Sequence, residues 1–198
     1  MSVLLPLLGT GLAQGSAQAT VVPPGTVVDC AGITDIGWSR LYPDPAEGVL
    51  VFRGYDYTVV STTRTFDVAD SRIVYNDTDT TASGSFTATQ SRTFAFTFSF
   101  GLQGPLVGKI NASIGLSISL SYTTSVGVTA TAPIPPHGAL LGEYGVQAFD
   151  IVYHAQQFRM LIDERSGTQQ RRCSAEQVIA NQTAHAPTAL EGWRVRNA

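Results

Sequence analysis

Residues 93–100 read TFAFTFSF, and residues 106–123 read LVGKINASIGLSISLSYT. In both stretches apolar side chains stand mainly at even positions, and small polar residues stand at most odd positions. Because successive side chains of a β-strand point to opposite faces, a period of two sustained this long predicts strands. The segment between the stretches, Gly101-Leu102-Gln103-Gly104-Pro105, is rich in turn formers. The pattern predicts an amphipathic β-hairpin over residues 92–114.

The expected hairpin has one apolar and one polar surface. If Phe100 lies opposite Leu106, the numbers of paired residues add up to 206, and Phe96 lies opposite Ile110. Even residues then face even residues along both strands. The apolar surface continues past the hairpin on the return strand, through Ile118 and Leu120.

The rest of the chain is also typical of an all-β protein. It contains 19 Gly and 10 Pro, and Thr, Ser, Val, Phe and Tyr fill the segments between them. Residues 49–74, 117–131 and 144–162 are expected to form strands. Helical periodicity is nearly absent, with one short helix expected at residues 174–180. The tail, residues 171–198, is expected to be irregular.

Charge is scarce in the chain and almost missing around the hairpin. Charged residues make up 14% of the sequence, and the formal net charge is -3, which argues against a nucleic-acid partner. Between residues 80 and 142 only Arg92 and Lys109 are charged. A sheet surface facing water normally carries Lys, Glu and Arg, partly to prevent edge-to-edge aggregation. An uncharged hydroxyl face is better suited to a strand that enters another environment.

The hairpin has the dimensions of a membrane-crossing unit. Residues 92–100 and 106–114 supply about nine residues each, which at a ~40° tilt cover about 23 Å of a ~25 Å apolar band. Unpaired backbone groups in hydrocarbon cost several kcal/mol each, so several copies of the chain would have to share one barrel. The alternative is a permanent sandwich or stalk. On the membrane hypothesis, the lipid-facing residues are Phe94, Phe96, Phe98, Phe100, Ile110, Ala112 and Ile114, and the lumen-facing residues are Thr93, Thr97, Ser99, Lys109, Asn111 and Ser113.

The N-terminus and the cysteines indicate export. Residues 1–19 contain an apolar stretch and end in the cleavage pattern Ala17-Gln18-Ala19, typical of a signal peptide. In an oxidising compartment the two cysteines, Cys30 and Cys173, are expected to form a disulfide. The alternative is two unrelated buried thiols. The three scattered histidines do not have the spacing of a zinc site.

No catalytic motif, metal site or cofactor fingerprint is present, so we expect neither an enzyme nor a cofactor. Three aromatic residues outside the hairpin, Trp38, Tyr42 and Trp193, allow two interpretations. They form a patch that stacks on sugar or lipid, or they pack around the disulfide in a small core.

The order of the motifs resembles aerolysin-type β-pore-forming proteins, in particular the epsilon-toxin and mosquitocidal-toxin branch. The resemblance covers residues 55–162. The motifs that carry it are Asn76-Asp77-Thr78-Asp79, the Ser/Thr-rich residues 85–90, the amphipathic hairpin, the Ser/Thr-rich residues 117–131, and Pro133-Ile134-Pro135-Pro136-His137-Gly138. The resemblance implies a secreted monomer that binds a cell surface, oligomerises and inserts its hairpin as a transmembrane β-barrel.

The expected fold is therefore all-β: an elongated aerolysin-like module of long antiparallel strands (residues 55–162) with an insertion hairpin. Residues 20–54 and 163–198 are expected to form a small head tied by Cys30 and Cys173. The expected function is that of a secreted pore-forming protein, whose partners are membrane lipid or a cell-surface receptor and further copies of itself. The alternative is a secreted binding or structural β-module, such as an adhesin or assembly subunit, without lytic activity.

Overall fold

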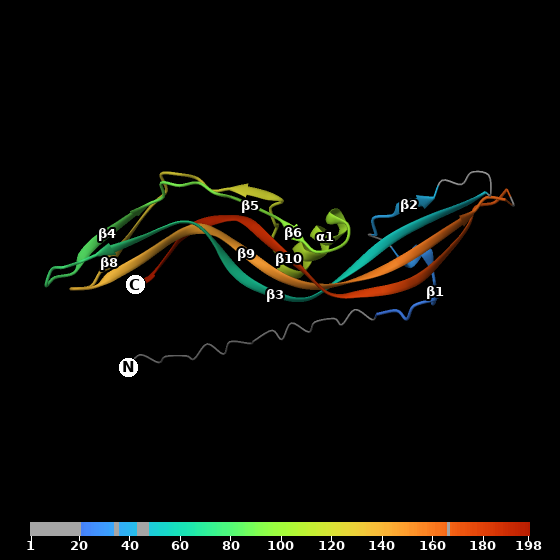
Figure 1. Ribbon diagram of the computed structural model, residues 1–198, viewed down its shortest axis with the longest axis horizontal. Helices are drawn as coiled ribbons and strands as arrows, with labels where there is room; N and C mark the ends of the chain where they lie inside the picture. Colours follow the sequence, from blue (N-terminus) through green and yellow to red (C-terminus); the bar gives the residue numbers. More distant parts are fainter. Residues whose placement is uncertain (1–20, 34–35, 43–47, 166) are drawn as a thin grey trace, which may run out of the picture.

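Three long antiparallel strands form the body of the molecule. The computed structural model describes residues 21–33, 36–42, 48–165 and 167–198; the expected signal peptide, residues 1–19, lies outside them. β3 (Val49–Tyr75), β9 (Ala139–Asp163) and β10 (Gln170–Asn197) pair in the order β10-β9-β3. Figure 1 shows them running along the length of an elongated molecule. The predicted all-β architecture of long antiparallel strands is confirmed.

The central strand, β9, is mostly buried along its length, because it pairs with β10 on one side and β3 on the other. The pairing is interrupted by register shifts, for example between Val59 and Ser61 and between Val68 and Asp70 in β3. Such bulges increase the local right-handed twist of a strand pair. The body is consequently a twisted, curved ribbon (Figure 1).

The C-terminal segment differs from the expectation. Residues 171–198 are not irregular, and no helix forms at residues 174–180, because this whole segment belongs to β10. Pairing with β9 along nearly the whole length of both strands outweighs the weak local pattern. β10 also runs beyond the head to the opposite end of the body (Figure 1), so the C-terminal segment is shared between the head and the rest of the molecule.

The head is the end of the molecule where short N-terminal elements cover the body strands. β1 (Val27–Val28) pairs with β10, and β2 (Ser39–Tyr42) pairs with β3. Between them lies the short 3-10 helix η1 (Cys30–Gly32). A small cluster of buried residues joins these elements to the body: Ile36, Phe158 and Ala175, with Val22, Val28, Ile33 and Trp38 packed against it.

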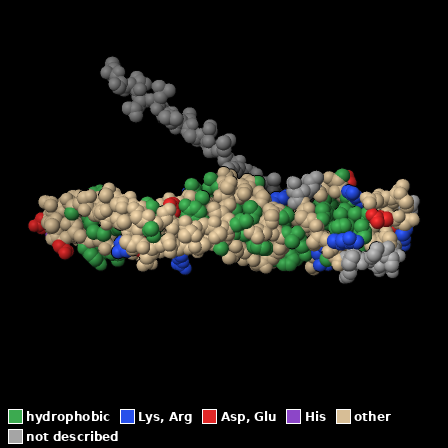
Figure 2. Space-filling view, turned by 90° about the horizontal axis from the view of Figure 1, so that it is seen from above, with side chains coloured by type: hydrophobic (Ala, Val, Ile, Leu, Met, Phe, Trp, Pro, Cys, Tyr) green, Lys and Arg blue, Asp and Glu red, His purple; other side chains and the backbone are tan. Residues whose placement is uncertain are grey.

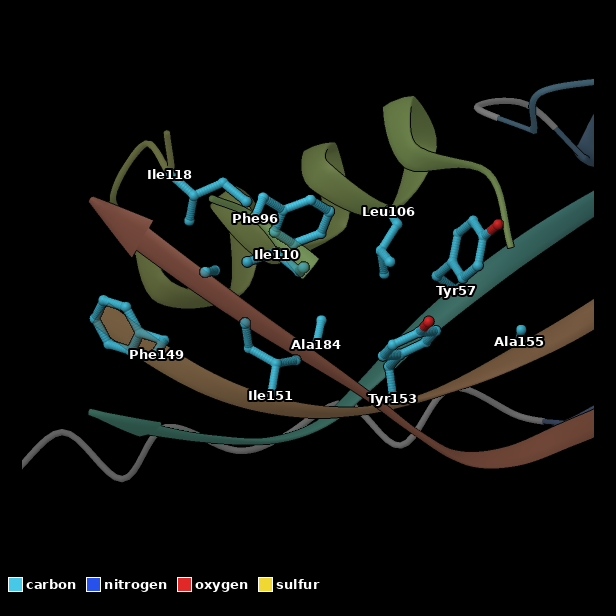
Figure 3. Close-up of a cluster of buried hydrophobic side chains, with 11 residues drawn as sticks. Tyr57, Phe96, Leu106, Ile110, Ile118, Phe149, Ile151, Tyr153, Ala155 and Ala184 are labelled. Carbon is cyan, nitrogen blue, oxygen red and sulfur yellow. The ribbon is translucent and has the colours of Figure 1, made fainter. Parts of the chain in front are cut away.

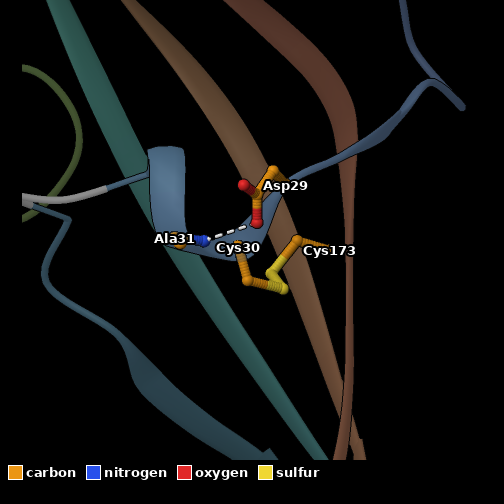
Figure 4. Close-up of a disulfide and its surroundings, with 4 residues drawn as sticks. All are labelled: Asp29, Cys30, Ala31 and Cys173. Atoms are coloured by element: carbon orange, nitrogen blue, oxygen red, sulfur yellow. Dashed lines mark hydrogen bonds between the residues drawn. A yellow bond between two sulfur atoms is a disulfide. The ribbon is translucent and has the colours of Figure 1, made fainter.

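The predicted disulfide is confirmed: Cys30 in η1 is bonded to Cys173 in β10 (Figure 4). Beside it, the Asp29 carboxylate accepts a hydrogen bond from the Ala31 backbone N–H and caps η1. The bond joins residues 143 positions apart. It therefore ties the N-terminal elements of the head to the body.

Removing this disulfide is expected to destabilise the protein strongly. The double variant Cys30→Ala/Cys173→Ala should lose about 4–5 kcal/mol of unfolding free energy, because a loop of this length carries a large closure entropy in the unfolded chain. Urea unfolding followed by Trp fluorescence measures the loss, with reduced wild-type protein as the control. An unchanged unfolding midpoint in both samples would contradict the expected role of the bond.

A second layer lies along one face of the body (Figure 1). We call this layer, residues 82–134, the tongue. Its elements are β4 (Ala82–Thr87), β5 (Thr93–Ala95), β6 (Thr97–Phe98), α1 (Gln103–Ile114), β7 (Ser121–Thr123) and β8 (Thr129–Ile134). Within the described ranges, no helix combines the length and hydropathy needed to cross a membrane.

The two segments at which the tongue begins and ends, which we call its roots, are joined at the end of the molecule opposite the head. The Asn76 side-chain amide donates hydrogen bonds to the backbone carbonyls of Thr80 (2.8 Å), Ile134 (3.1 Å) and Pro135 (3.0 Å). Its oxygen accepts from the backbone N–H and the hydroxyl of Thr78. One buried side chain thus joins the entry and the exit of the tongue.

Trp193 also lies at this far end and not in the head. Its ring centroid is 5.3 Å from that of Tyr144 and 5.7 Å from that of Phe86. The interpretation that Trp193 joins Trp38 in one patch or core is therefore wrong; the side chain of Tyr42 lies outside the described residues. The physical reason is the length of β10, which carries Trp193 away from the disulfide.

Candidate functional site

The two paired segments of the tongue share one register. β4 pairs with β8, from Ala82 opposite Ile134 to Thr87 opposite Thr129. Further along, β5 pairs with β7, with Ala95 opposite Ser121. The numbers of every such pair add up to 216 (82 and 134, 95 and 121). Three backbone hydrogen bonds between and beyond these strands keep the same register: they run from the N–H groups of Ala88, Thr124 and Phe96 to the carbonyls of Val128, Arg92 and Leu120. A further bond, from the Gly127 N–H to the Ala88 carbonyl, departs from it by one residue.

The expected register, in which paired numbers add up to 206, is therefore wrong, and so is the expected strand over residues 106–114. That segment belongs to α1. Gly101 turns the chain at φ 108°, and Pro105 stands in the first helical turn, where its missing N–H leaves no bond unmade. Gly115, at φ 69°, ends the helix. The turn-rich segment is thus a helix start and not a hairpin turn.

The sequence pattern of residues 106–114 is compatible with a strand and with a helix. Leu106, Ile110 and Ile114 are spaced by four residues, which places them on one face of a strand and equally on one face of a helix. In the structure Leu106 and Ile110 are fully buried. The helix keeps the same apolar residues directed toward the body.

The two faces of the tongue strands follow the predicted alternation. On the even face, Phe86, Ala88 and Phe96 are buried against the body, whereas the odd-numbered residues of β4 and β5 are exposed. Hydroxyl pairs cross the exposed face, with Thr87 Oγ1 3.0 Å from Thr129 Oγ1 and Thr93 Oγ1 2.7 Å from Thr123 Oγ1. The apolar side of the tongue therefore forms part of the core.

The largest hydrophobic cluster among the described residues lies between the tongue and the body. Figure 3 shows Leu106 and Ile110 pointing from α1 toward the body strands, where Tyr57, Ile151 and Tyr153 lie. The other buried members are Phe96, Ile118, Phe149, Ala155, Ala184 and Ala186. Burying a side chain such as Leu or Ile is worth about 1.5–3 kcal/mol. This cluster therefore supplies much of the free energy that holds the tongue in place.

Two buried tyrosines of the body form hydrogen bonds to the tongue backbone before α1. The Leu102 N–H donates to Tyr57 Oη (2.5 Å), and Tyr153 Oη donates to the Phe100 carbonyl (2.5 Å). Burial raises the pKa of Tyr57, which keeps its hydroxyl protonated. The two tyrosines thus satisfy the Leu102 N–H and the Phe100 carbonyl, which lie between β6 and α1.

Polar contacts at the edges of the tongue complete its attachment to the body. β6 pairs with β10, with Phe98 opposite Ala184 and Thr97 opposite His185. On α1, Lys109 Nζ lies 3.0 Å from Asp56 Oδ1. Nearer the roots, the Thr89 N–H donates to the buried Asp70 carboxylate (2.8 Å). Burial alone would raise the pKa of Asp70, but the Thr89 hydrogen bonds and the Arg72 charge lower it below its ordinary value.

A histidine lies where the tongue meets β10. The His185 ring nitrogens lie 2.7 Å from Asp150 Oδ1 in β9 and 2.7 Å from Asp67 Oδ2 in β3. Partial burial alone would lower the pKa of His185, but the two carboxylates raise it above its ordinary value. Arg92 of the tongue lines the same hollow as Asp67 and His185. The His185 ring therefore links the three body strands directly beside β6.

Stability is expected to fall as this histidine loses its proton. A raised folded-state pKa means that the stabilisation is fully present below about pH 6.5 and is lost as pH rises through the folded pKa. The melting temperature of the wild type, measured from pH 6 upward, should therefore fall toward that of His185→Gln. Parallel curves for the two proteins across this window would contradict the assignment.

In the structure the predicted lipid-facing residues are mostly more buried than the predicted lumen-facing residues. Of the predicted lipid-facing set, Phe96 and Ile110 are buried, Phe94, Phe98, Phe100 and Ile114 are half-buried, and Ala112 is exposed. Of the predicted lumen-facing set, Thr93, Thr97, Ser99 and Ser113 are exposed, whereas Lys109 and Asn111 are half-buried. Asn111 Oδ1 accepts a hydrogen bond from the Ile118 N–H (2.9 Å).

Sequence reasoning missed the partners of the tongue on the body, namely Tyr57, Tyr153 and His185. No local pattern marks these residues, because their roles depend on pairing between distant strands. The predicted lipid-facing set also lacks Leu106 and Ile118. Their even positions beside the alternating stretches were the signal that could have included them.

No protein-family model matches the sequence, and no curated protein matches it. Among solved structures, a non-toxic crystal protein from Bacillus thuringiensis is similar with a TM-score of 0.31 and 10% identity, over 73% of this chain and 82% of that chain. The parasporin-2 Bacillus thuringiensis toxin that recognizes cancer cells is similar with a TM-score of 0.30 and 9% identity, over 77% of this chain and 76% of that chain. At these TM-scores the likeness identifies no fold, so the architecture rests on the strand pairing itself.

Proposed function

We propose that this chain is a secreted, non-enzymatic pore-forming protein whose tongue inserts into a membrane as a β-hairpin. The observation that carries the proposal is the register of the tongue. Where paired numbers add up to 216, even residues lie opposite even residues. If the same pairing extended through α1, the apolar residues of both arms would share one face.

The extended hairpin that follows from this register has well-matched arms. Phe96 would lie opposite Leu120, and the tip would form at Val107-Gly108-Lys109, where Gly108 favours a tight turn. Each arm, residues 96–106 and 110–120, has about eleven residues and covers about 28 Å at a ~40° tilt, enough for a ~25 Å apolar band. The other pairs on the lipid-facing side would be Phe98 with Ile118, Phe100 with Leu116, Leu102 with Ile114, Gly104 with Ala112, and Leu106 with Ile110.

The register with pairs adding up to 216 also gives a place to the apolar residues that follow the hairpin expected over residues 92–114. With pairs adding up to 206, Ile118 and Leu120 would have extended beyond the membrane band. With pairs adding up to 216, both fall opposite phenylalanines within it. The opposite face carries small or polar residues, including Thr97, Ser99 and Ser117, suited to a water-filled lumen.

The conversion of α1 into strand is favoured by the weakness of the helix itself. Leu102 at the N-cap provides no side-chain hydrogen bond, and the helix has no acidic residue in its first turn and no basic residue in its last turn. Gly104 and Gly108 each lower helix stability by about 1 kcal/mol relative to Ala. The helix therefore depends on the burial of Leu106 and Ile110 against the body.

Oligomerisation and secretion belong to the same proposal. A single hairpin in hydrocarbon would leave both edges without hydrogen-bond partners, so several copies of the chain must close one barrel. The Cys30–Cys173 disulfide supports an oxidising, extracellular location. The proposed partners are therefore membrane lipid or a surface receptor and copies of the chain itself, with no nucleic acid or cofactor.

A second candidate function is a secreted binding or structural β-module, such as an adhesin or assembly subunit. The complete burial of Leu106 and Ile110 favours it, because a tongue packed this well is also suited to a permanent layer. On this alternative the uncharged face of the tongue would contact a partner protein or glycan.

Dye release from liposomes distinguishes the two candidates. A pore-forming protein should release a small trapped dye and leave SDS-resistant oligomers on the membrane, while a large trapped dextran remains inside. A protein that binds a glycan or partner but stays monomeric on every bilayer, without release, would overturn the proposal in favour of the second candidate.

A further inference from the structure

Four arginines of the head have no carboxylate partner among the described residues: Arg53, Arg159, Arg171 and Arg172. We call them the arginine patch. The Arg53 Nε atom is buried without a hydrogen-bond partner, and Arg159 and Arg172 are exposed. The patch therefore presents positive charge that the described part of the head leaves unneutralised.

The strand register brings three of these side chains to one face of the sheet. Arg53 of β3 is directly opposite Arg159 of β9. Arg159 is opposite Ser174 of β10, and Arg172 stands two residues before Ser174. Directly opposed partners and residues two apart share a face. Like charges directly opposite each other destabilise a sheet, so the Arg53–Arg159 pair has a cost that an anionic ligand would remove.

The described acidic groups of the head are engaged elsewhere. The Asp163 carboxylate pairs with Arg165, and Asp56 pairs with Lys109 of the tongue. Three further carboxylates accept hydrogen bonds from neutral donors: Asp29 from Ala31, Glu164 from Gln169, and Glu176 from Gln157.

Apolar surface adjoins the patch. Val51 and Leu161 are half-buried cross-strand partners on the same face as Arg53 and Arg159. Figure 2 shows Lys and Arg side chains beside hydrophobic ones at the head end of the molecule, with Asp or Glu side chains also in view there. At the edge of β10, Arg171 and Arg172 line a hollow of about 490 Å³ beside the disulfide.

We propose that the arginine patch docks the head onto a bilayer that contains anionic phospholipid. A guanidinium matches a phosphate group with two parallel hydrogen bonds, and adjoining apolar groups favour the boundary between headgroups and acyl chains. Since Arg53 and Arg159 lie on the side of the sheet that the tongue covers, docking brings the tongue toward the membrane. This inference rests on the proposed function and names the lipid class that the protein meets first.

Vesicle sedimentation with the intact protein tests the patch. The protein should bind phosphatidylcholine vesicles that contain phosphatidylglycerol and not phosphatidylcholine vesicles alone, and added salt should weaken binding. Arg159→Gln and Arg172→Gln should each weaken partitioning about fivefold, as expected for a basic side chain near an anionic surface. Arg64→Gln removes the same charge from an exposed position outside the head and should leave partitioning within about twofold of wild type.

Equal binding to both kinds of vesicle, or equal losses for Arg64→Gln and the patch variants, would overturn the docking surface. Binding to a sulfated polysaccharide without any binding to anionic vesicles would overturn it as well. Anionic binding without dye release would support the patch while contradicting pore formation. Dye release that patch variants leave unchanged would contradict the patch alone.

Discussion

Leu116→Arg is expected to abolish dye release, whereas Ser117→Arg, one residue further on, is expected to preserve it. In the proposed hairpin Leu116 lies opposite Phe100 near the middle of the membrane band, on the lipid-facing side. An arginine there costs about 2–4 kcal/mol for every chain in the barrel. The protein concentration needed for half-maximal release should therefore rise at least about 30-fold.

The pair is well matched because neither side chain is part of the core of the soluble protein. Leu116 is 37% exposed, and Ser117 is also exposed. Both variants should thus keep the melting temperature of the wild type, which separates insertion from folding. An arginine at position 117 would face the lumen and should shift ion selectivity toward anions. If Leu116→Arg releases dye as well as Ser117→Arg does, the face assignment fails.

Locking the tongue to β10 is expected to have an equally large effect. Ser99, the residue after β6, lies opposite Thr183 of β10, and a 2.9 Å hydrogen bond runs from the Ser99 N–H to the Thr183 carbonyl. Directly paired antiparallel residues have a Cα separation that suits a disulfide. In the double variant Ser99→Cys/Thr183→Cys, the oxidised protein should bind vesicles normally and release about 100-fold less dye, since β6 cannot leave the body.

Mild reduction should restore release to the oxidised variant. The natural cysteines are already paired with each other, so the new pair is the reducible bond that differs from wild type. Wild type treated with the same reductant and the single variant Ser99→Cys provide the controls. Full release by the oxidised double variant would mean that the tongue forms no part of the pore.

The sequence was sufficient to predict the faces of the tongue but not its register. Alternation at residues 93–100 survives in the structure as a buried even face and an exposed odd face. Register depends on where the chain turns, and the segment starting at Gly101 reads equally well as a hairpin turn and as a helix start. Residues four apart lie on one face of a strand and also on one face of a helix. The spacing of Leu106 and Ile110 therefore could not distinguish the two structures.

Long-range pairing explains the other differences. β10 has no sustained alternation, yet it forms the longest strand because β9 offers it a partner along nearly its whole length. The contact of His185 with Asp67 spans 118 positions in the sequence, so local patterns contain no trace of it. The disulfide was predictable because only two cysteines were available.

The different lengths of the paired strands give the molecule two mechanical responses. A pull along the long axis should load the hydrogen bonds between β3, β9 and β10 together, in shear. The body should therefore resist extension in this direction. A pull at right angles on the tongue should load its contacts separately from those of the body, because β6 pairs with β10 at only two residues. We therefore expect the molecule to be stiff along its length and able to release the tongue while the body strands stay paired.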